Sequence, residues 1–314
     1  MRLAILGAGL AARIHSKALQ AAPGVERWYA SRDDARGRAS AARFKGTGHF
    51  ASYESALASP HVDTVLVALP PALHLDWTLR AFEAGKHVVV EKPPFLTTVD
   101  FSRAVSAADR AGRQLLVGEN YFYKPLTVLL RTVVRQGDLG EVRFIHVNAL
   151  KRQSTGDWRD DASLTGGGAL FEGGIHWISL LANVGLTPVR ARAARVGGGS
   201  GLERNTLVTL EYGEGAAAAL SYSWDLPSAI NGLRVSRVYG TAGTLRFETN
   251  GLAALLWGRR KRVLVPGLMD LTGHRAMWLD FLSAIAENRP PAYHSALAMR
   301  DLRLVEDAYA SLNL

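Results

Sequence analysis

The chain has 314 residues, 48% of them hydrophobic and 21% charged, with a formal net charge of +9 and no cysteine. This length allows two hydrophobic cores, and no apolar run approaches the roughly 20 residues of a membrane-spanning helix. Disulfides and thiolate chemistry are excluded, and a cytoplasmic location is expected. The densest basic run, residues 259–262, is predicted to be a solvated hairpin turn. No nucleic-acid-binding motif accompanies the charge, so we expect neither a nucleic-acid nor a membrane partner.

The first elements along the chain predict a dinucleotide-binding turn. A short buried strand, Arg2–Leu6, runs into the spacing G-x-G-x-x-A, which opens a helix that extends to about Ala21. The glycines allow a tight turn and close approach of a pyrophosphate, and the helix N-terminus favours the anion. A structural turn and a secretory signal peptide are alternatives, which the later elements disfavour. The expected cofactor contacts are Gly7, Gly9, Leu10, Ala11 and Ala12.

The end of the second predicted strand, Val25–Ala30, indicates which cofactor is bound. NAD-specific sites place an acidic residue here to hold the ribose 2′-hydroxyl. This strand instead ends in Ser31 and Arg32, with Arg36 one turn further on. Arginine binds a 2′-phosphate through charge-assisted hydrogen bonds, whereas a carboxylate repels it. We therefore predict NADP, and the two aspartates that follow Arg32 keep NAD possible.

Further strands at Val62–Leu69, Val88–Val90 and Leu115–Val117 alternate with segments of helical length. This alternation predicts a parallel sheet with right-handed crossovers. Residues 1–119 are therefore expected to form a Rossmann domain with a doubly wound parallel sheet. Its ligands bind at the carboxyl edge of the strands, where the segment Glu91–Pro93 follows a buried strand.

Residues 120–314 are expected to form a C-terminal α+β domain for substrate binding and oligomerisation. After a strand at Val142–Leu150 and a helix at Ala169–Asn183, six segments with strand character follow between residues 189 and 257, and two helices close the chain. Short turns between successive strands indicate a large, mostly antiparallel sheet. Such a sheet often pairs its free face with a second subunit, and the apolar run Ala216–Tyr222 fits a homodimer or higher homo-oligomer.

Glu172 and His176 are candidate proton-transfer residues in the helix that follows three glycines. At a spacing of four residues, their side chains would share one helical face and be able to meet. An acidic partner would orient the imidazole and favour its charged form. A core histidine is the structural alternative. A metal ion is not expected, because no third ligand has an evident spacing.

Several motifs together resemble the Gfo/Idh/MocA oxidoreductases, relatives of glucose–fructose oxidoreductase and inositol dehydrogenase. The resemblance implies an NAD(P)-dependent enzyme that transfers a hydride between the nicotinamide and a sugar, cyclitol or related carbonyl or polyol substrate. The segments that carry it are Gly7–Gly9, Ala68–His74, Ala84–Pro93, Gly118–Pro125, Trp158–Arg159 and Gly166–His176.

The resemblance implies a role for each matching residue. Lys92 would lie beside the nicotinamide and the substrate hydroxyl, His176 would donate or accept the hydroxyl proton, and Glu172 would orient His176 or bind a neighbouring hydroxyl. Ser31, Arg32 and Arg36 resemble 2′-phosphate contacts of an NADP-dependent relative. The remaining implied cofactor contacts are Leu69, Pro70, His74, Glu91, Lys92, Asn120, Trp158 and Arg159.

The chain departs from the family pattern at three positions. Relatives usually have aspartate where Glu172 stands, often have aspartate at Ser179, and commonly have arginine at Phe122. These changes leave the substrate open, and its recognition is expected in the loops 153–165 and 224–231. A redox-neutral glycoside-processing enzyme and a non-catalytic NADP-sensing regulator are the alternatives, and net cofactor turnover separates them from the leading prediction.

Overall fold

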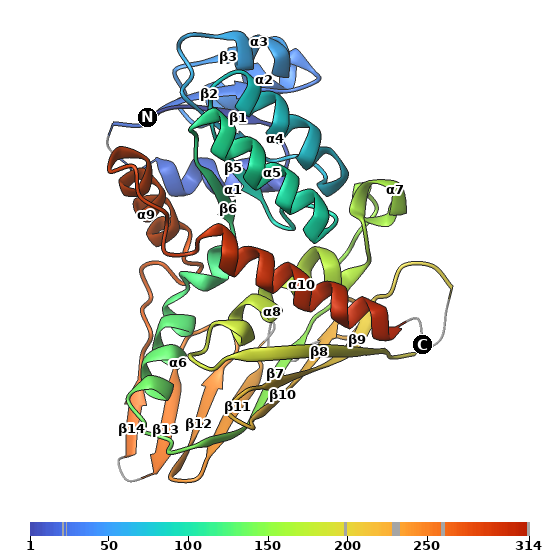
Figure 1. Ribbon diagram of the computed structural model, residues 1–314, viewed down its shortest axis with the longest axis vertical. Helices are drawn as coiled ribbons and strands as arrows, with labels where there is room; N and C mark the ends of the chain where they lie inside the picture. Colours follow the sequence, from blue (N-terminus) through green and yellow to red (C-terminus); the bar gives the residue numbers. More distant parts are fainter. Residues whose placement is uncertain (21, 23, 198–199, 228–232, 259–260, 313–314) are drawn as a thin grey trace. The chain divides into compact units, whose positions relative to one another are not determined.

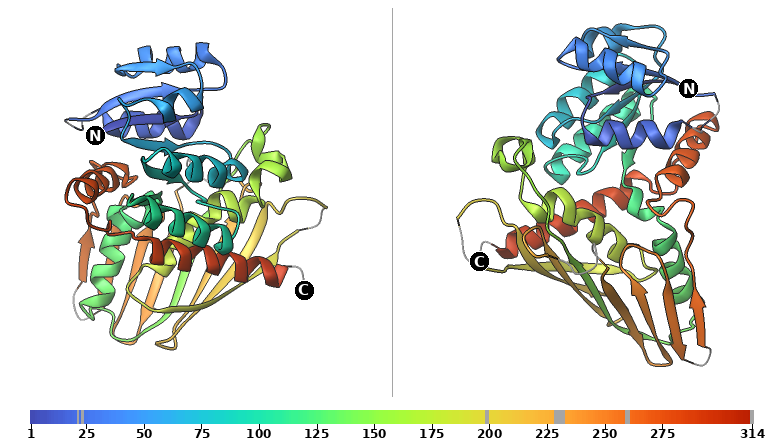
Figure 2. Two further views of the ribbon diagram at one scale, coloured as in Figure 1. Left: turned by 45° about the horizontal axis from the view of Figure 1, so that its top comes forward. Right: turned by 180° about the vertical axis from the view of Figure 1, so that it is seen from behind.

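The computed structural model describes residues 1–20, 22, 24–197, 200–227, 233–258 and 261–312. The chain forms two compact units, Met1–Glu119 with His274–Met299, and Asn120–Gly273 with Arg300–Leu314 (Figures 1 and 2). Three predictions reach outside the described residues: the end of the first helix at Ala21, residues 228–231 of the second substrate loop, and residues 259–260 of the basic run.

The first unit contains a six-stranded parallel sheet in the order β3-β2-β1-β4-β5-β6. Strands β1, β4 and β5 are continuous apolar runs whose central residues are fully buried, because helices cover both faces of such a sheet. The structure confirms the predicted doubly wound sheet, to which it adds β3. The strands are β1 (Arg2–Leu6), β2 (Glu26–Ala30), β3 (Gly48–Phe50), β4 (Thr64–Val67), β5 (His87–Glu91) and β6 (Leu115–Gly118).

One helix of the first unit comes from the far end of the sequence. Helix α9 (His274–Ala286) buries Met277, Trp278 and Phe281, and the Trp278 Nε1–H donates a hydrogen bond to His15 Nδ1 at 2.9 Å. The sequence analysis assigns this segment to the C-terminal domain, whereas its contacts place it in the first unit. The other helices are α1 (Leu10–Leu19), α2 (Asp34–Arg43), α3 (Tyr53–Ala58), η1 (Pro71–Leu73), α4 (His74–Glu83) and α5 (Thr98–Ala111).

The second unit contains an eight-stranded sheet in the order β14-β13-β12-β11-β7-β10-β9-β8. Neighbouring strands are antiparallel except β7 and β10, which are parallel, so the predicted mostly antiparallel sheet is confirmed. Lys261 and Arg262, predicted as part of a turn, begin β14. The strands are β7 (Val142–Leu150), β8 (Pro188–Arg195), β9 (Asn205–Tyr212), β10 (Ala217–Ser223), β11 (Val235–Gly240), β12 (Gly243–Glu248), β13 (Ala254–Gly258) and β14 (Lys261–Leu264).

The two faces of this sheet differ in composition. In β9, Val208 and Leu210 are buried while Leu207 is exposed, the period-two pattern of a sheet covered on one side. The helices lie over the buried face (Figure 1). The other face exposes Phe144 and Trp257. The helices of this unit are η2 (Asn120–Phe122), α6 (Pro125–Arg135), η3 (Trp158–Asp160), α7 (Ala162–Thr165), the π-helix η4 (Leu170–Gly174), α8 (Ile175–Ala182) and most of α10 (Ser295–Leu312).

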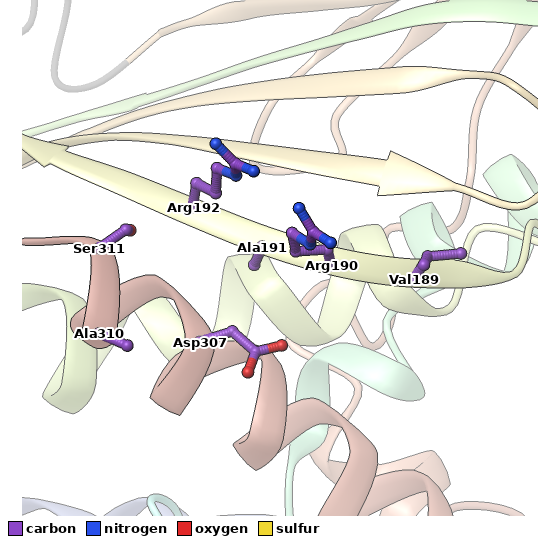
Figure 3. A pocket seen from close by; sticks show the side chains of 7 residues that line it. All are labelled: Val189, Arg190, Ala191, Arg192, Asp307, Ala310 and Ser311. Atoms are coloured by element: carbon purple, nitrogen blue, oxygen red, sulfur yellow. The ribbon is translucent and has the colours of Figure 1, made fainter.

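The end of α10 contacts the backbone of the edge strand β8. The Ser311 hydroxyl accepts a hydrogen bond from the backbone N–H of Ala193 at 2.7 Å and lies 3.2 Å from the carbonyl oxygen of the same residue. Figure 3 shows Asp307 and Ser311 on the helix beside this strand, with a groove between the two elements. These two backbone groups of Ala193 are thereby less available for pairing with another strand. Within the described residues, no helix is long and apolar enough to cross a membrane.

Candidate active site

The turn between β1 and α1 fits a bound pyrophosphate. Gly7 has φ +112°, and a Cβ on it would lie 2.4 Å from the Ala68 carbonyl oxygen, so only glycine is accommodated. Gly9 begins α1 without a side-chain cap, and a Cβ on it would meet no atom within 4 Å. The space beside Gly9 is therefore open, which leaves room for an anion near the N-terminus of α1. The neighbouring Leu10 side chain is 61% exposed, which suits a position that a cofactor covers.

Two arginines lie exposed after the end of β2, and the two aspartates beside them bind groups of α2. Asp33 caps α2 by accepting a hydrogen bond from the Ala35 N–H at 3.0 Å, and Asp34 forms an ion pair with Arg38 at 2.9 Å. Arg32 and Arg36 are exposed, and in the described part of the chain their guanidinium groups make no hydrogen bond or ion pair. Ser31 is buried directly before them. This edge thus offers positive charge and spare donors.

Glu91, at the end of β5, is a buried carboxylate with two fixed partners. It accepts the Lys92 backbone N–H at 2.9 Å and forms a short hydrogen bond with His15 Nε2. Because the Trp278 indole N–H can only donate, His15 Nδ1 is an acceptor and the ring proton lies on Nε2, facing Glu91. Burial raises the pKa of Glu91, but the hydrogen bond from His15 and the neighbouring positive charges, including Lys92, outweigh it and lower the pKa to about 2.

His74 joins the two turns at the carboxyl edge of the sheet. Its Nδ1 lies 2.9 Å from the Pro93 carbonyl oxygen, and its Nε2 lies 2.8 Å from that of Leu69. The ring is fully buried, and burial lowers the pKa of His74 against the opposing effect of these hydrogen bonds. Both ring nitrogens are therefore occupied by backbone, and His74 positions the turn after Lys92. Its predicted contact with the cofactor, like that of Pro70, stays a prediction.

In the second unit, Glu172 lies in the π-helix η4 rather than in the predicted α-helix. Arg159 Nε donates to its carboxylate at 3.2 Å, and Arg159 also forms an ion pair with Asp157. The predicted contact of Arg159 with the cofactor stays a prediction, and its observed partners are Glu172 and Asp157. The predicted contact between Glu172 and His176, and the roles of both, stay predictions.

His176 packs against an aromatic residue that the sequence analysis does not assign to the site. It is the one residue of α8 that is not fully buried, and its ring stacks on Tyr121 with centroids 4.4 Å apart and planes 15° apart. The Lys124 ammonium lies 4.3 Å from the centroid of the Tyr121 ring. Tyr121 stands beside Asn120 in one of the motifs quoted above, which is the signal that could have identified it.

Tyr222 on β10 is a second residue that the sequence analysis misses. A Cβ on Gly173 would lie 2.2 Å from its hydroxyl oxygen, which also accepts the Trp224 Nε1–H at 2.8 Å. Burial, followed by the charge of Glu172, raises the pKa of Tyr222 well above its ordinary value. A neutral hydroxyl is thus kept close to the Glu172 carboxylate. No local pattern marks Tyr222, because this proximity depends on the fold.

The glycines before η4 allow a buried carboxylate to hold its N-terminus. Glu203 accepts the N–H groups of Gly168 at 3.1 Å and Leu170 at 2.8 Å, and it accepts the Tyr309 hydroxyl proton at 2.6 Å. A Cβ on Gly168 would lie 2.3 Å from the Glu203 carbonyl oxygen. The segment that carries Glu172 and His176 is therefore fixed by residues distant in sequence.

Two other predicted cofactor contacts are engaged within the second unit. The Asn120 side-chain amide donates to the Thr272 carbonyl oxygen at 2.6 Å, and the Trp158 ring lies 4.7 Å from the Arg159 guanidinium. Their contacts with a cofactor remain predictions. Within the described residues, no group of three or more histidine or acidic side chains is arranged to hold a metal ion.

Comparison with known proteins assigns the family. Residues 1–119 match the oxidoreductase family with an NAD-binding Rossmann fold, and residues 127–246 match the GFO/IDH/MocA C-terminal domain. The chain belongs to the Gfo/Idh/MocA family. The resemblance that the motifs suggest is thereby confirmed over both units.

Among members of the Gfo/Idh/MocA family, the chain is 34% identical over 200 residues to dTDP-3,4-didehydro-2,6-dideoxy-alpha-D-glucose 3-reductase from Saccharopolyspora spinosa, covering 62% of this chain and 59% of that protein. It is 28% identical to D-xylose 1-dehydrogenase (NADP(+)) 2 of Haloferax volcanii, covering 99% and 97%. The structure of GenD2 from gentamicin A biosynthesis, in complex with NAD, aligns with a TM-score of 0.86 and 25% identity over 100% of this chain and 94% of GenD2. Several relatives are matched over about half of their own length.

Proposed function

We propose that this protein is an NADP-dependent oxidoreductase that transfers a hydride between the nicotinamide and a sugar, cyclitol or related polyhydroxylated carbonyl compound. The observation that carries the proposal is the buried Glu91, hydrogen-bonded to His15 and to the Lys92 N–H, at the carboxyl edge of the Rossmann sheet. This edge is where doubly wound folds bind ligands. The sugar substrates in the names of the Saccharopolyspora and Haloferax relatives support the substrate class.

Three side chains carry the proposed chemistry, while a bound nicotinamide supplies or accepts the hydride. The Lys92 ammonium stabilises negative charge that develops on the substrate oxygen. His176, held by stacking on Tyr121, donates or accepts the hydroxyl proton. Glu172, held by Arg159, orients His176 or binds a neighbouring hydroxyl.

The preference for NADP rests on the edge of β2. Arg32 and Arg36 retain spare donors for a 2′-phosphate, whereas Asp33 and Asp34 are engaged with their own helix. The Haloferax relative is named for NADP(+), and GenD2 is bound to NAD, so the family includes both cofactors. We assign the preference in this chain to the two arginines.

The test is a screen of NADPH and NADH oxidation with sugar lactones, keto-sugars and inososes, and of NADP reduction with polyols. We expect turnover with one substrate class. Lys92→Ala should then lower kcat by about 1000-fold with NADPH affinity kept, while Lys17→Ala, an exposed lysine on α1, leaves both unchanged. Activity retained in Lys92→Ala removes Lys92 from the mechanism. Tight NADPH binding without net turnover favours the redox-neutral enzyme or the regulator instead.

A homodimer formed through the open face of the large sheet is part of the same proposal. That face exposes Phe144, Val235, Trp257 and Val263, each more than half accessible. Exposed apolar side chains on the uncovered face of a sheet favour association with a second subunit. We also infer a cytoplasmic location, which the absence of cysteine supports.

A further inference from the structure

A polar pocket lies where the two predicted substrate loops meet in the second unit. The Gln153 N–H donates to the Trp224 carbonyl oxygen at 2.8 Å, and Arg152 forms a backbone bridge with Asp225. These contacts follow the parallel ends of β7 and β10. The cavity has a volume of about 560 Å³, and its walls include Thr155, Asp160 and Arg204.

The acidic groups of this pocket are already satisfied by protein donors. Asp225 accepts Arg204 Nε at 2.7 Å and the Asn205 amide at 2.9 Å. The hydrogen bond from Arg204 lowers the pKa of Asp225, which keeps this carboxyl ionised and bound. Asp160 accepts the Gly156 N–H at 2.6 Å and lies 3.8 Å from Arg204. Both carboxylates are therefore engaged by Arg204 and by neighbouring N–H groups, and the charge of Arg152 contributes to the lowered pKa of Asp225.

Arg152 is the charged group of the pocket with spare hydrogen-bonding capacity. Its side chain is exposed, and among the described residues its guanidinium makes no hydrogen bond or ion pair. Its five N–H donors suit a carboxylate or phosphate, which accept two parallel hydrogen bonds from arginine. With both aspartates engaged, the walls present mainly donors, and a ligand with acceptor oxygens complements them.

Two stretches of chain connect this pocket to Glu172. Arg159, which donates to Glu172, directly precedes Asp160 in the pocket wall. Tyr222, whose hydroxyl packs against Gly173 next to Glu172, precedes the pocket residue Trp224 by two positions along β10 and the turn after it. Two residues of extended chain span roughly 7 Å, about the length of one sugar ring. A substrate hydroxyl near Glu172 and a substituent in the pocket can therefore belong to one molecule.

We propose that this pocket binds an anionic substituent of the substrate, a carboxylate or a phosphate, through Arg152. The inference rests on the proposed function and narrows it, since the substrate becomes a sugar acid or a phosphorylated sugar rather than a neutral sugar. Arg152 is then a specificity-determining residue that lies away from the reacting carbon.

The experiment measures binding by titration calorimetry to the full-length protein in the presence of NADPH. The probes are D-glucuronate, D-glucose 1-phosphate and uncharged D-glucose, so the two anionic arms separate carboxylate from phosphate. We expect at least one anion to bind about 10-fold or more tightly than glucose, and Arg152→Gln to remove that advantage. Arg110→Gln, an equally exposed arginine on α5, is the matched control and should preserve it.

Equal binding of glucose and both anions, or an anion preference that survives Arg152→Gln, overturns the proposal, as does failure of both anions to bind. The proposed oxidoreductase function is judged separately, by net oxidation of NADPH. Binding of the anions through Arg152 without turnover of NADPH supports the anion subsite and contradicts the oxidoreductase function. Turnover of a sugar acid or a phosphorylated sugar that is the same with and without Arg152 supports the oxidoreductase function and contradicts the anion subsite.

Discussion

Glu91 is held by His15 from α1, which in turn is held by Trp278 from α9, so its environment is more constrained than its motif indicates. Its partner His15 comes from α1, and Trp278 fixes the tautomer of His15 from α9. Hydrogen bonding and positive charge keep the carboxylate ionised although it is only 8% exposed. At the scale of the residue, this arrangement fixes the backbone of Lys92, whose N–H binds Glu91.

The depressed pKa of Glu91 predicts a loss of stability in acid. Its folded value of about 2 lies below the reference value of 4.5, so its contribution is complete above pH 4.5 and is lost as the pH falls towards 2. The difference corresponds to a free energy of unfolding on the order of 3 kcal/mol. Urea unfolding across this window should show a shallower pH dependence in Glu91→Gln than in the wild type. The exposed Glu83→Gln serves as control, and parallel curves for all three proteins would contradict the assignment.

The two arginines after β2 predict a selective effect on cofactor binding. Replacing Arg32 and Arg36 by alanine should weaken NADPH binding by about 10- to 100-fold, because charge-assisted hydrogen bonds to the 2′-phosphate are lost. NADH binding should change little. Arg43→Ala, at the other end of α2, tests for a general effect of charge. Fluorescence titration gives both dissociation constants, and an equal loss for the two cofactors would place the arginines outside the 2′-phosphate site.

At the scale of the element, sequence periodicity predicts where the helical segment around Glu172 lies but not which type of helix it forms. The prediction of a helix over Ala169–Asn183 is close to the observed limits, yet the first turns are π-helical and only Ile175–Ala182 is α-helical. The contacts of this segment come from elsewhere in the chain: Glu203 and Tyr309 bind the N-terminal amides, and the Tyr222 hydroxyl packs against Gly173. Local propensity contains no information about such partners.

Tyr309 provides a test of how strongly this segment is fixed. Its hydroxyl donates to Glu203 and lies 3.1 Å from the N–H groups of Gly168 and Phe171. Tyr309→Phe should lower the free energy of unfolding by about 1–3 kcal/mol, because buried polar partners lose a hydrogen bond. It should also reduce kcat while NADPH affinity is kept. Tyr239→Phe, on the open face of the sheet, should change neither quantity, and a Tyr309→Phe protein with wild-type stability and kcat would show that the contact is dispensable.

At the scale of the whole molecule, the pattern of apolar residues along the strands predicts both sheets, because each sheet follows one pattern. The parallel sheet is buried on both faces and reads as continuous apolar runs, whereas the second sheet alternates buried and exposed residues. Two elements are not predicted by these patterns. The short β3, with the sequence GHF, carries no pattern, and α9 has an apolar face that fits either unit.

The exposed side chains of the large sheet lead to a prediction about assembly. Phe144→Asp combined with Trp257→Asp places two charges on the open face and should convert a dimer into a monomer, since burying unpaired charges is costly. Light scattering at micromolar protein concentration measures the mass. Val99→Asp changes an apolar residue of α5 that is 69% exposed and should leave the mass unchanged. A monomeric wild-type protein would refute the dimer itself.

The return of α9 to the first unit has an evolutionary consequence. A gene segment for residues 1–119 would encode every strand of the parallel sheet but would omit Trp278, the hydrogen-bond donor to His15. His15, which packs against Trp278 and His274 of α9, would then lose these contacts. Recombination that exchanges one catalytic domain for another by joining coding sequences end to end would separate these partners. We therefore expect the coding sequence of residues 1–119 to be inherited together with that of α9, and so with the coding sequence of the second unit that lies between them.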